Sequence, residues 1–448
     1  MATVNRRAKS DKVHTHEGGV AYQHISPYME LRRAVLSCLL WENEFYESGE
    51  DIVKRIEKLS AQVPPVMLAS LAVEARLGFN LRHVSLLLAV LLVKYGQGRD
   101  DLLVRTTVSQ VIERADEIAE MLAIYWRKGK IPLPAQLKKG LADAFAKFDE
   151  YQFAKYDRGN KIKLRDVMRM VHPNPGNERR SQLYKRINER SLETPDTWEV
   201  GLSSGGNKKE VWTRLLSENK LGYLALLRNL RNMEKAGVDH ELIKRAILNR
   251  KGGAERVLPF RYVAAARAAP QFEACIDQSL SKSIEDLPVL GGTTIILVDV
   301  SGSMDGKLSA KSDLTRVDAA AALASIINAD SARVFTFSNN IVEIPHRKGM
   351  AGVDAIIRSQ AHGGTLLGKV LDRVYSLPYD RLIVITDEQT ADTTPDPSVF
   401  GKKHYMINVA SYQRGVGYGK YWTHIDGFSE NVIRYIHEAE YQEKMAAD

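Results

Sequence analysis

The sequence predicts a protein of two parts, an all-α helical repeat followed by a C-terminal α/β domain. From Ser26 to about Ser281, apolar residues recur at the three- and four-residue spacing of amphipathic helices. After Asp286, β-branched runs alternate with helical segments, which is typical of a parallel, doubly wound sheet. At 448 residues the chain is long enough to bury the cores of two or three domains.

Charge divides the chain at the same place. The residues from Asp286 onward include 16 Lys and Arg and 20 Asp and Glu, a net charge of −4, whereas the residues before it carry a net charge of +12. The basic excess suits contact with a polyanion. The two cysteines, Cys38 and Cys275, form neither a disulfide framework nor a metal-ligand spacing, which favours a reducing, cytoplasmic compartment.

The beginning of the chain has no features of a targeting segment. Residues 1–17 are polar and basic, and we expect them to form a disordered tail without a signal peptide. The most apolar run, Val84 to Val93, suits a buried helix and is too short to span a bilayer, so we expect no membrane association.

The first part is predicted to consist of stacked helical hairpins. Polar turns at Asn80, 96–98 and 129–132 separate helical segments, and this organisation predicts an α-solenoid. Residues 172–207 are rich in Pro, Gly, Asn, Ser and Arg with little periodicity, and we expect a long loop there. Helical patterning resumes at Trp212 and runs to about Ala269.

The second part alternates strands and helices. We expect strands at 293–298, 333–337, 381–386 and 404–409, and helices at 315–329, 351–359, 366–376 and 428–440. The first strand is apolar without alternation, which indicates burial on both faces, as in a parallel sheet.

Short oxygen ligands follow two of these strands and precede one helix. Asp299, Ser301 and Ser303 come after the first strand, Thr365 follows two glycines, and Asp387 ends the strand at 381–386. Ligands of open α/β sheets gather at the carboxyl ends of the strands, so we expect these side chains to converge. Hydroxyls with few carboxylates suit Mg²⁺ better than an all-carboxylate Ca²⁺ cage. The Asp-x-Ser-x-Ser spacing by itself is equally a common turn sequence.

This combination, over residues 287–448, resembles the von Willebrand factor A domain with its metal-ion-dependent adhesion site. All five ligand positions of that family's motif are filled here, by Asp299, Ser301, Ser303, Thr365 and Asp387. The resemblance implies a divalent metal with an open coordination position, which a ligand's carboxylate or phosphate could fill.

A basic stretch runs from Lys155 to Arg190, with 11 Lys and Arg against 4 Asp and Glu. Leu164, Val167 and Val171 predict a helix with one apolar face, and Pro173 is expected to end it. For any single basic residue a solvated surface is the simpler interpretation, but the clustering favours phosphate contacts. Without a zinc finger, basic zipper or helix-turn-helix, single-stranded RNA is favoured over a duplex.

Residues 18–282 resemble the TROVE module of Ro ribonucleoproteins. The motifs that carry the resemblance are Gly18-Gly19, Leu81-Arg82-His83-Val84, Lys155-Tyr156 with the basic helix to His172, and Ala225-Leu226-Leu227-Arg228-Asn229-Leu230. The resemblance implies a monomeric ring of HEAT-like helical repeats closed by the A domain. It implies binding of small noncoding Y RNA on the outer surface and of single-stranded 3′ ends of misfolded RNAs, in RNA quality control or decay. In bacterial or phage forms it also implies cooperation with a 3′-exoribonuclease.

The family's RNA-contacting lysine and histidine fall on Lys155 and His172. The arginine that the family places four residues after the lysine is Gly159 here, with Arg158 beside it. The expected RNA-binding residues are Lys155, Arg158, Lys161, Arg165, Arg169, His172, Arg179 and Arg180. For Leu226 to Leu230 a structural role is favoured over RNA contact.

The alternatives to RNA binding are a protein-binding adaptor and an enzyme. A protein-binding adaptor would grip a partner's carboxylate through Mg²⁺ and use the helices as a scaffold. Enzymatic activity is not expected, because the 11 histidines are scattered and form no set of nucleophile, base and orienting residue. A metal-dependent nuclease would also need a denser carboxylate cluster for two ions.

Overall fold

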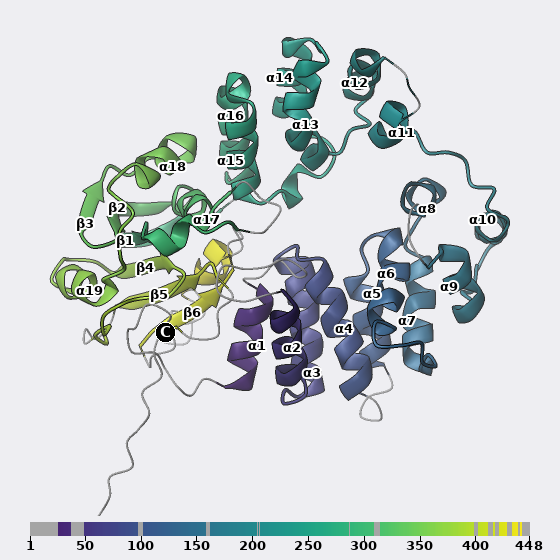
Figure 1. The fold of residues 1–448 in the computed structure, drawn as a ribbon, viewed down its shortest axis with the longest axis horizontal. Helices are drawn as coiled ribbons and strands as arrows, with labels where there is room; N and C mark the ends of the chain where they lie inside the picture. Colours follow the sequence, from purple (N-terminus) through teal and green to yellow (C-terminus); the bar gives the residue numbers. More distant parts are fainter. Residues whose placement is uncertain are drawn as a thin grey trace, which may run out of the picture. The chain divides into compact units, whose positions relative to one another are not determined.

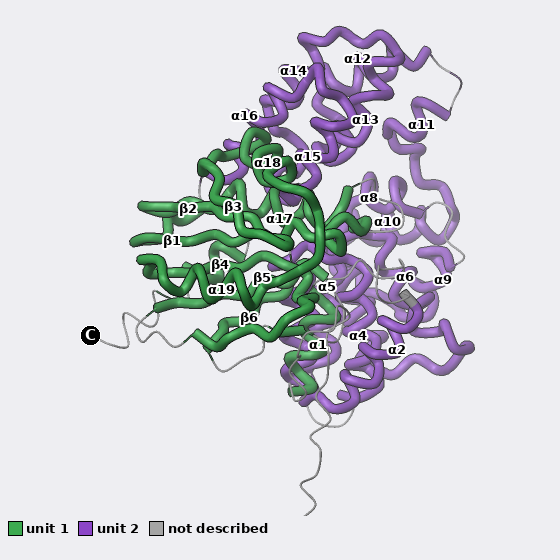
Figure 2. The backbone as a smooth tube through the Cα atoms, turned by 60° about the vertical axis from the view of Figure 1, so that its left-hand side comes forward, with its two compact units in different colours: residues 1–38, 42–48, 286–448 green, residues 39–41, 49–285 purple. Residues whose placement is uncertain are grey.

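A computed structural model describes residues 26–36, 49–96, 102–157, 162–203, 205, 207–285, 287–308, 314–397, 402–410, 415–416, 421–427, 432–437 and 440. The chain forms two compact units, coloured separately in Figure 2. One contains helix α1 (Pro27–Leu36) and the chain from residue 287 onward, and the other contains residues 49–285. The prediction left α1 in the helical part, whereas α1 packs against strand β6 of the sheet. The expected tail at 1–17 lies outside the described residues.

The α/β unit is built on one six-stranded sheet with the order β3-β2-β1-β4-β5-β6. Every neighbouring pair is parallel except β2 and β3. The strands are β1 (Leu290–Asp299), β2 (Ala329–Phe337), β3 (Ile341–Ile344), β4 (Arg381–Thr386), β5 (Lys403–Asn408) and β6 (Thr423–Asp426). The four expected strands are confirmed. The edge strands β3 and β6 were not predicted, because four residues are too few to show a period.

Helices cover both faces of this sheet. They are α17 (Arg316–Ala324), α18 (Gly349–Ile357) and α19 (Leu367–Tyr375), and residues 432–437 are also helical. The predicted helix at 315–329 was too long. Its start is confirmed by the capping box of Thr315 and Asp318, but it ends at Ala324, and β2 already begins at Ala329.

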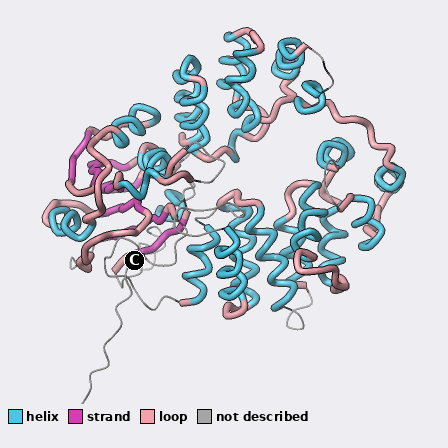
Figure 3. The backbone as a smooth tube through the Cα atoms, in the orientation of Figure 1, coloured by secondary structure: helices cyan, strands magenta, loops and turns pink. Residues whose placement is uncertain are grey.

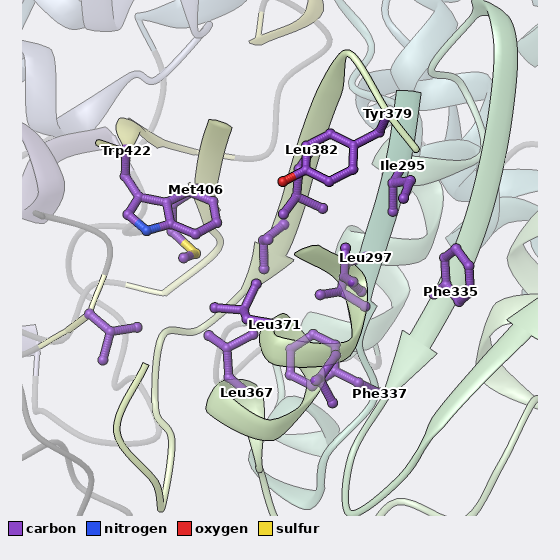
Figure 4. Close-up of a cluster of buried hydrophobic side chains, with 14 residues drawn as sticks. Ile295, Leu297, Phe335, Phe337, Leu367, Leu371, Tyr379, Leu382, Met406 and Trp422 are labelled. Carbon is purple, nitrogen blue, oxygen red and sulfur yellow. The ribbon is translucent and has the colours of Figure 1, made fainter. Parts of the chain in front are cut away.

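The core of the α/β unit follows from the alternation of side chains along each strand. Ile295 and Leu297 point to the face that α19 covers, where they join the buried cluster with Leu371 in Figure 4. The intervening Ile296 and Val298 are equally buried and point to the opposite face, where α17 packs on β1 and β4. Burial on both faces explains why the strand sequence lacks alternation, as predicted.

The second unit is a succession of helices (Figures 1 and 3), and many of them pack on the helix two places away in the sequence, as α5 does on α7 and α14 on α16. Helix α4 is buried from Val84 to Val93, as expected from its apolar run. No helix in the described part of the chain is long and apolar enough to cross a membrane. The helices are α2 (Gly49–Ser60), α3 (Pro65–Val73), α4 (His83–Tyr95), α5 (Leu103–Val111), α6 (Ala115–Tyr125), α7 (Ala135–Phe145), α8 (Glu150–Tyr156), α9 (Leu164–Val171), α10 (Glu178–Glu189), α11 (Trp198–Ser203), α12 (Lys208–Ser217), α13 (Tyr223–Lys235), α14 (His240–Asn249), α15 (Pro259–Ala268) and α16 (Glu273–Ser283).

The prediction of a long loop at 172–207 was wrong, because α10 and α11 lie within it. The side chain of Asn177 accepts a hydrogen bond from the Arg180 amide and so begins α10. Leu183, Tyr184 and Ile187 are the buried residues of that helix. Three apolar positions among twelve residues were too few to outweigh the polar composition of the segment.

A buried charge network ties α1 to the carboxyl ends of β4, β5 and β6. Glu388 is fully buried, and its carboxylate lies 3.4 Å from Nη1 of Arg33 on α1. The same carboxylate accepts a hydrogen bond from Asn408 Nδ2 at 2.7 Å and pairs with His424 Nε2, and the His424 Nδ1 lies 3.5 Å from Asp426. Breaking a buried pair of this kind leaves an uncompensated charge, so the network fixes how α1 docks.

The stability of the α/β unit should fall as the pH rises from about 6.5 to 9. Burial by itself would lower the pKa of His424, but the carboxylates of Asp426 and Glu388 together raise it to about 9. A folded-state pKa above the unfolded value gives stability that is complete below the unfolded pKa and is lost as the pH rises through the folded one. Urea unfolding across this range should show a loss on the order of 3 kcal/mol.

The variant His424→Gln should remove this pH dependence, whereas His346→Gln should retain it. Burial lowers the pKa of His346, so that residue contributes no such loss above pH 6.5. A native protein whose unfolding midpoint stays constant from pH 6.5 to 9 would contradict the assignment.

Candidate metal centre and candidate nucleic-acid interface

The first ligand loop is anchored at the end of β1. The Ser301 amide donates to Asp299 Oδ1 at 2.9 Å, and the Thr386 hydroxyl donates to Asp299 Oδ2 at 2.6 Å. The hydroxyl oxygens of Ser301 and Ser303 lie 3.1 Å apart, and all three ligand-loop side chains are buried. The short loop after β1 therefore holds one carboxylate and two hydroxyls in a fixed arrangement.

A glycine loop brings Thr365 to this place. The Gly302 amide donates to the Gly363 carbonyl at 2.8 Å, which links the two loops directly. A Cβ atom at Gly363 would lie 2.3 Å from Asn339 Nδ2, so a larger residue there would force the Asn339 side chain to move. Thr365 is buried, and its carbonyl accepts hydrogen bonds from the Thr390 hydroxyl and the Ala391 amide.

Asp387 follows β4, the strand that pairs with β1. Its Oδ1 accepts from the Gln389 amide at 3.2 Å, and its Oδ2 lies 3.5 Å from Nη1 of the buried Arg316 on α17. Burial, and after it the charge of Asp387, raise the pKa of Asp299 to about 7. The buried carboxylates of Asp299 and Asp387 and the hydroxyls of Ser301 and Ser303, with Thr365 on the loop linked to them, offer oxygen donors only, and such a set fits a hard divalent cation. Sequence reasoning missed Arg316, since nothing in its helical context marks it as buried.

The basic stretch forms a surface on α8, α9 and α10. Helix α9 ends as predicted, with His172 exposed in the left-handed conformation at φ 49° and its amide donating to the Met168 carbonyl. The Lys155 ammonium lies over the rings of Tyr151 and Tyr156, at 5.7 and 5.4 Å from their centroids. Arg158, Gly159, Lys161 and the Gly18-Gly19 motif lie outside the described residues.

The remaining predicted RNA-binding arginines divide into structural and exposed groups. Arg180 donates from Nη1 to the carbonyls of Phe145 and Phe148, at 3.0 and 3.3 Å, so it caps the end of α7. Arg165 lies 3.4 Å from Asp166, and Arg169 donates to Asn188 at 2.7 Å while staying exposed. Arg179, next to Arg180, is exposed.

Two motifs that carried the resemblance serve the packing of helices. Arg82 forms ion pairs with Asp116, Glu117 and Glu120 on α6, at 2.8, 3.1 and 2.5 Å, and so connects the start of α4 to α6. In α13, the leucines of the Leu226–Leu230 motif are buried, and Asn229 Nδ2 donates to the Ala225 carbonyl. The buried leucines agree with the expected core role, whereas Arg228 of the same motif is exposed.

Comparison with known proteins identifies relatives of both the helical unit and the whole chain. The family model described as "TROVE domain" matches residues 33–191 and 185–286. Two proteins named "Telomerase protein component 1" are similar to this chain. The one from Rattus norvegicus is 25% identical, covering 35% of this chain and 9% of that protein, and the one from Mus musculus is 38% identical, covering 18% and 3%. The chain thus spans less than a tenth of the length of these relatives.

A solved structure has the same fold. The crystal structure of the Ro (RSR) protein of Deinococcus radiodurans superposes with a TM-score of 0.59 and 18% identity, covering 91% of this chain and 98% of that one. The match agrees with the predicted combination of a helical repeat and an A-type α/β domain.

Two adjacent arginines should separate stability from RNA contact. Arg180→Ala should lower the free energy of unfolding by about 2 kcal/mol, because it leaves two carbonyls without a charged donor. Arg179→Ala, one residue away and exposed, should leave the urea-unfolding midpoint unchanged. Equal midpoints for the two variants would contradict the capping role of Arg180.

Proposed function

The chain belongs to the TROVE domain family, and we propose that it is an RNA-binding protein of the Ro type without enzymatic activity of its own. The observation that supports this proposal is the basic surface of α8 to α10, where Arg169, His172 and Arg179 are exposed. These side chains are positioned by helix ends and by packing rather than by ion pairs with carboxylates in the described residues. They are therefore available for phosphate oxygens.

The finer form of the proposal follows the resemblance to Ro proteins. We propose that the surface around Lys155 and His172 binds a small noncoding Y RNA, and that the helical unit also takes single-stranded 3′ ends of misfolded RNAs. Cooperation with a 3′-exoribonuclease in RNA quality control in the cytoplasm is part of the same proposal. Arg158 and Lys161 remain proposed contacts, and Arg180 supports the surface from beneath.

A second candidate function is carried by the α/β unit. We propose that Asp299, Ser301, Ser303, Thr365 and Asp387 hold Mg²⁺. When bound, the ion would supply a positive charge that attracts a partner's carboxylate or phosphate. The residues of the chain orient the site: Thr386 and the Ser301 amide fix Asp299, and Gly363 holds the Thr365 loop against the first loop. The unit would then act as a metal-dependent docking point for a protein.

RNA binding should be salt-dependent and should weaken when the central cations are removed. Filter binding of a structured small RNA between 50 and 300 mM salt should give a steep linear decrease of log affinity with log salt. Lys155→Gln with His172→Gln should weaken binding about tenfold and make the slope shallower by about one unit. Lys244→Gln on α14 is the matched charge control. A native protein whose affinity does not change with salt would overturn the proposal.

Magnesium should stabilise the native protein and leave Asp299→Asn unaffected. Thermal unfolding in Mg²⁺ and in EDTA should differ by a few degrees for the native chain, since a ligand that binds only the folded state raises its stability. In EDTA, Asp299→Asn should unfold at the native temperature or higher, because the variant removes one of two buried carboxylates. Asp305→Asn, a half-exposed carboxylate close in sequence and outside the donor set, should respond to Mg²⁺ like the native chain.

A further inference from the structure

One segment of the helical unit combines basic and aromatic residues without a single carboxylate. Residues 121–142 contain five Lys and Arg together with Tyr125 and Trp126, and they include no Asp or Glu. They form the end of α6, the turn after it and the beginning of α7. This composition is typical of surfaces that contact single-stranded nucleic acid, where cations follow the phosphates and aromatic rings stack on bases.

The turn of this segment encloses an open apolar cavity of about 440 Å³. The Trp126 indole N–H donates to the Ile131 carbonyl at 2.8 Å, and the Tyr125 hydroxyl donates to the Pro132 carbonyl at 3.0 Å, so both rings are fixed by the backbone of the turn. Helix α9 closes the cavity through Met170. The lining residues are Trp126, Lys130, Ile131, Pro132, Leu133, Lys138 and Met170.

The two lysines at this cavity lack the carboxylate partners that the neighbouring cations Arg127 and Lys128 have. Lys128 lies 2.9 Å from Glu57, and Arg127 pairs with the same carboxylate. Lys130 and Lys138 are exposed and have no carboxylate partner in the described residues, and the Lys130 ammonium lies 5.2 Å from the centroid of the Trp126 ring. The cavity therefore has a mostly apolar lining and two lysines without a carboxylate partner in the described residues. Such a site suits a ligand with a flat aromatic ring attached to an anionic backbone.

The cavity also adjoins the proposed RNA surface. Met170 follows Arg169 directly and lies two residues before His172 at the end of α9, so the cavity and these two exposed residues share one helix end. Continuity with this surface argues for a nucleic-acid occupant over a protein segment, for which the surrounding charge offers no particular complement.

We infer that the Trp126 cavity takes an unpaired nucleobase of the RNA strand that the helical unit binds, with Lys130 and Lys138 holding the flanking phosphates. The inference rests on the proposed RNA-binding function. The indole N–H is already used by Ile131, and the other polar side chains that line the cavity are the two lysines assigned to phosphates, so little in the lining distinguishes one base edge from another. The site therefore accepts any base that can stack, with little sequence preference.

The test uses one RNA duplex that carries either a ten-nucleotide uridine tail at its 3′ end or an abasic tail of equal length and charge. The native full chain should bind the uridine tail roughly 5- to 100-fold more tightly than the abasic tail, which is the range that base stacking supplies. This comparison needs no mutation, so misfolding of a variant does not affect it. Equal affinity for the two tails overturns the inference.

Variants of the cavity residues then test whether the difference in affinity between the two tails arises at Trp126. Trp126→Ala should abolish the difference between the tails, whereas Trp126→Phe should keep most of it, although both lose the indole hydrogen bond to Ile131. Lys130→Gln with Lys138→Gln should weaken both tails alike and reduce the salt slope, and Lys209→Gln on α12 is the charge control. Failure of the proposed function has a different result, because the native chain would then bind neither tail nor the structured RNA.

Discussion

Two carboxylates buried at the ends of adjacent parallel strands are the constraint on which the α/β unit depends. Taking a charge out of water is costly unless hydrogen bonds or an opposite charge compensate it. Asp299 receives the Thr386 hydroxyl and the Ser301 amide, and Asp387 faces Arg316. The compensation remains incomplete, as the raised pKa of Asp299 indicates. A bound cation would complete it, and for this reason we propose these residues as a metal centre.

Glu388, the residue after Asp387, is also a buried carboxylate, and its charge is compensated by other residues of the chain. Glu388 is as deeply buried, but Arg33, Asn408 and His424 surround it within the chain. Glu388 therefore has a structural role in the docking of α1, whereas Asp299, which accepts hydrogen bonds from the Thr386 hydroxyl and the Ser301 amide, is proposed as a cation ligand. We expect buried carboxylates at the ends of neighbouring strands to take different roles according to what surrounds them.

The sequence was sufficient for the fold class, because buried parallel strands are local patterns. It also placed the candidate oxygen ligands after β1 and β4, where the structure has them buried, and their role in binding a metal stays a prediction. It was insufficient wherever a role depends on a distant partner. Arg180 looked like a phosphate contact, and its carbonyl acceptors belong to the end of α7, 32 and 35 residues away. Arg82 was recognised only as part of a motif that carries the family resemblance, and its ion-pair partners lie on α6. Helix α10 was missed because its polar composition hid a narrow apolar stripe.

The same distinction governs the basic charge of the helical unit. The net positive charge of the helical unit overestimates the number of cations that a polyanion can contact. Arg82 and Arg127 form ion pairs with carboxylates, and Arg180 donates to backbone carbonyls. Among the cations that stay exposed are those near α9 together with Lys130 and Lys138, which adjoin the proposed RNA surface. Attraction by such a set is long-ranged and screened by salt, whereas a metal centre acts over one bond length and is lost on chelation. The two proposed binding modes therefore respond to different solution conditions, so each unit can be assigned its ligand without separating it from the other.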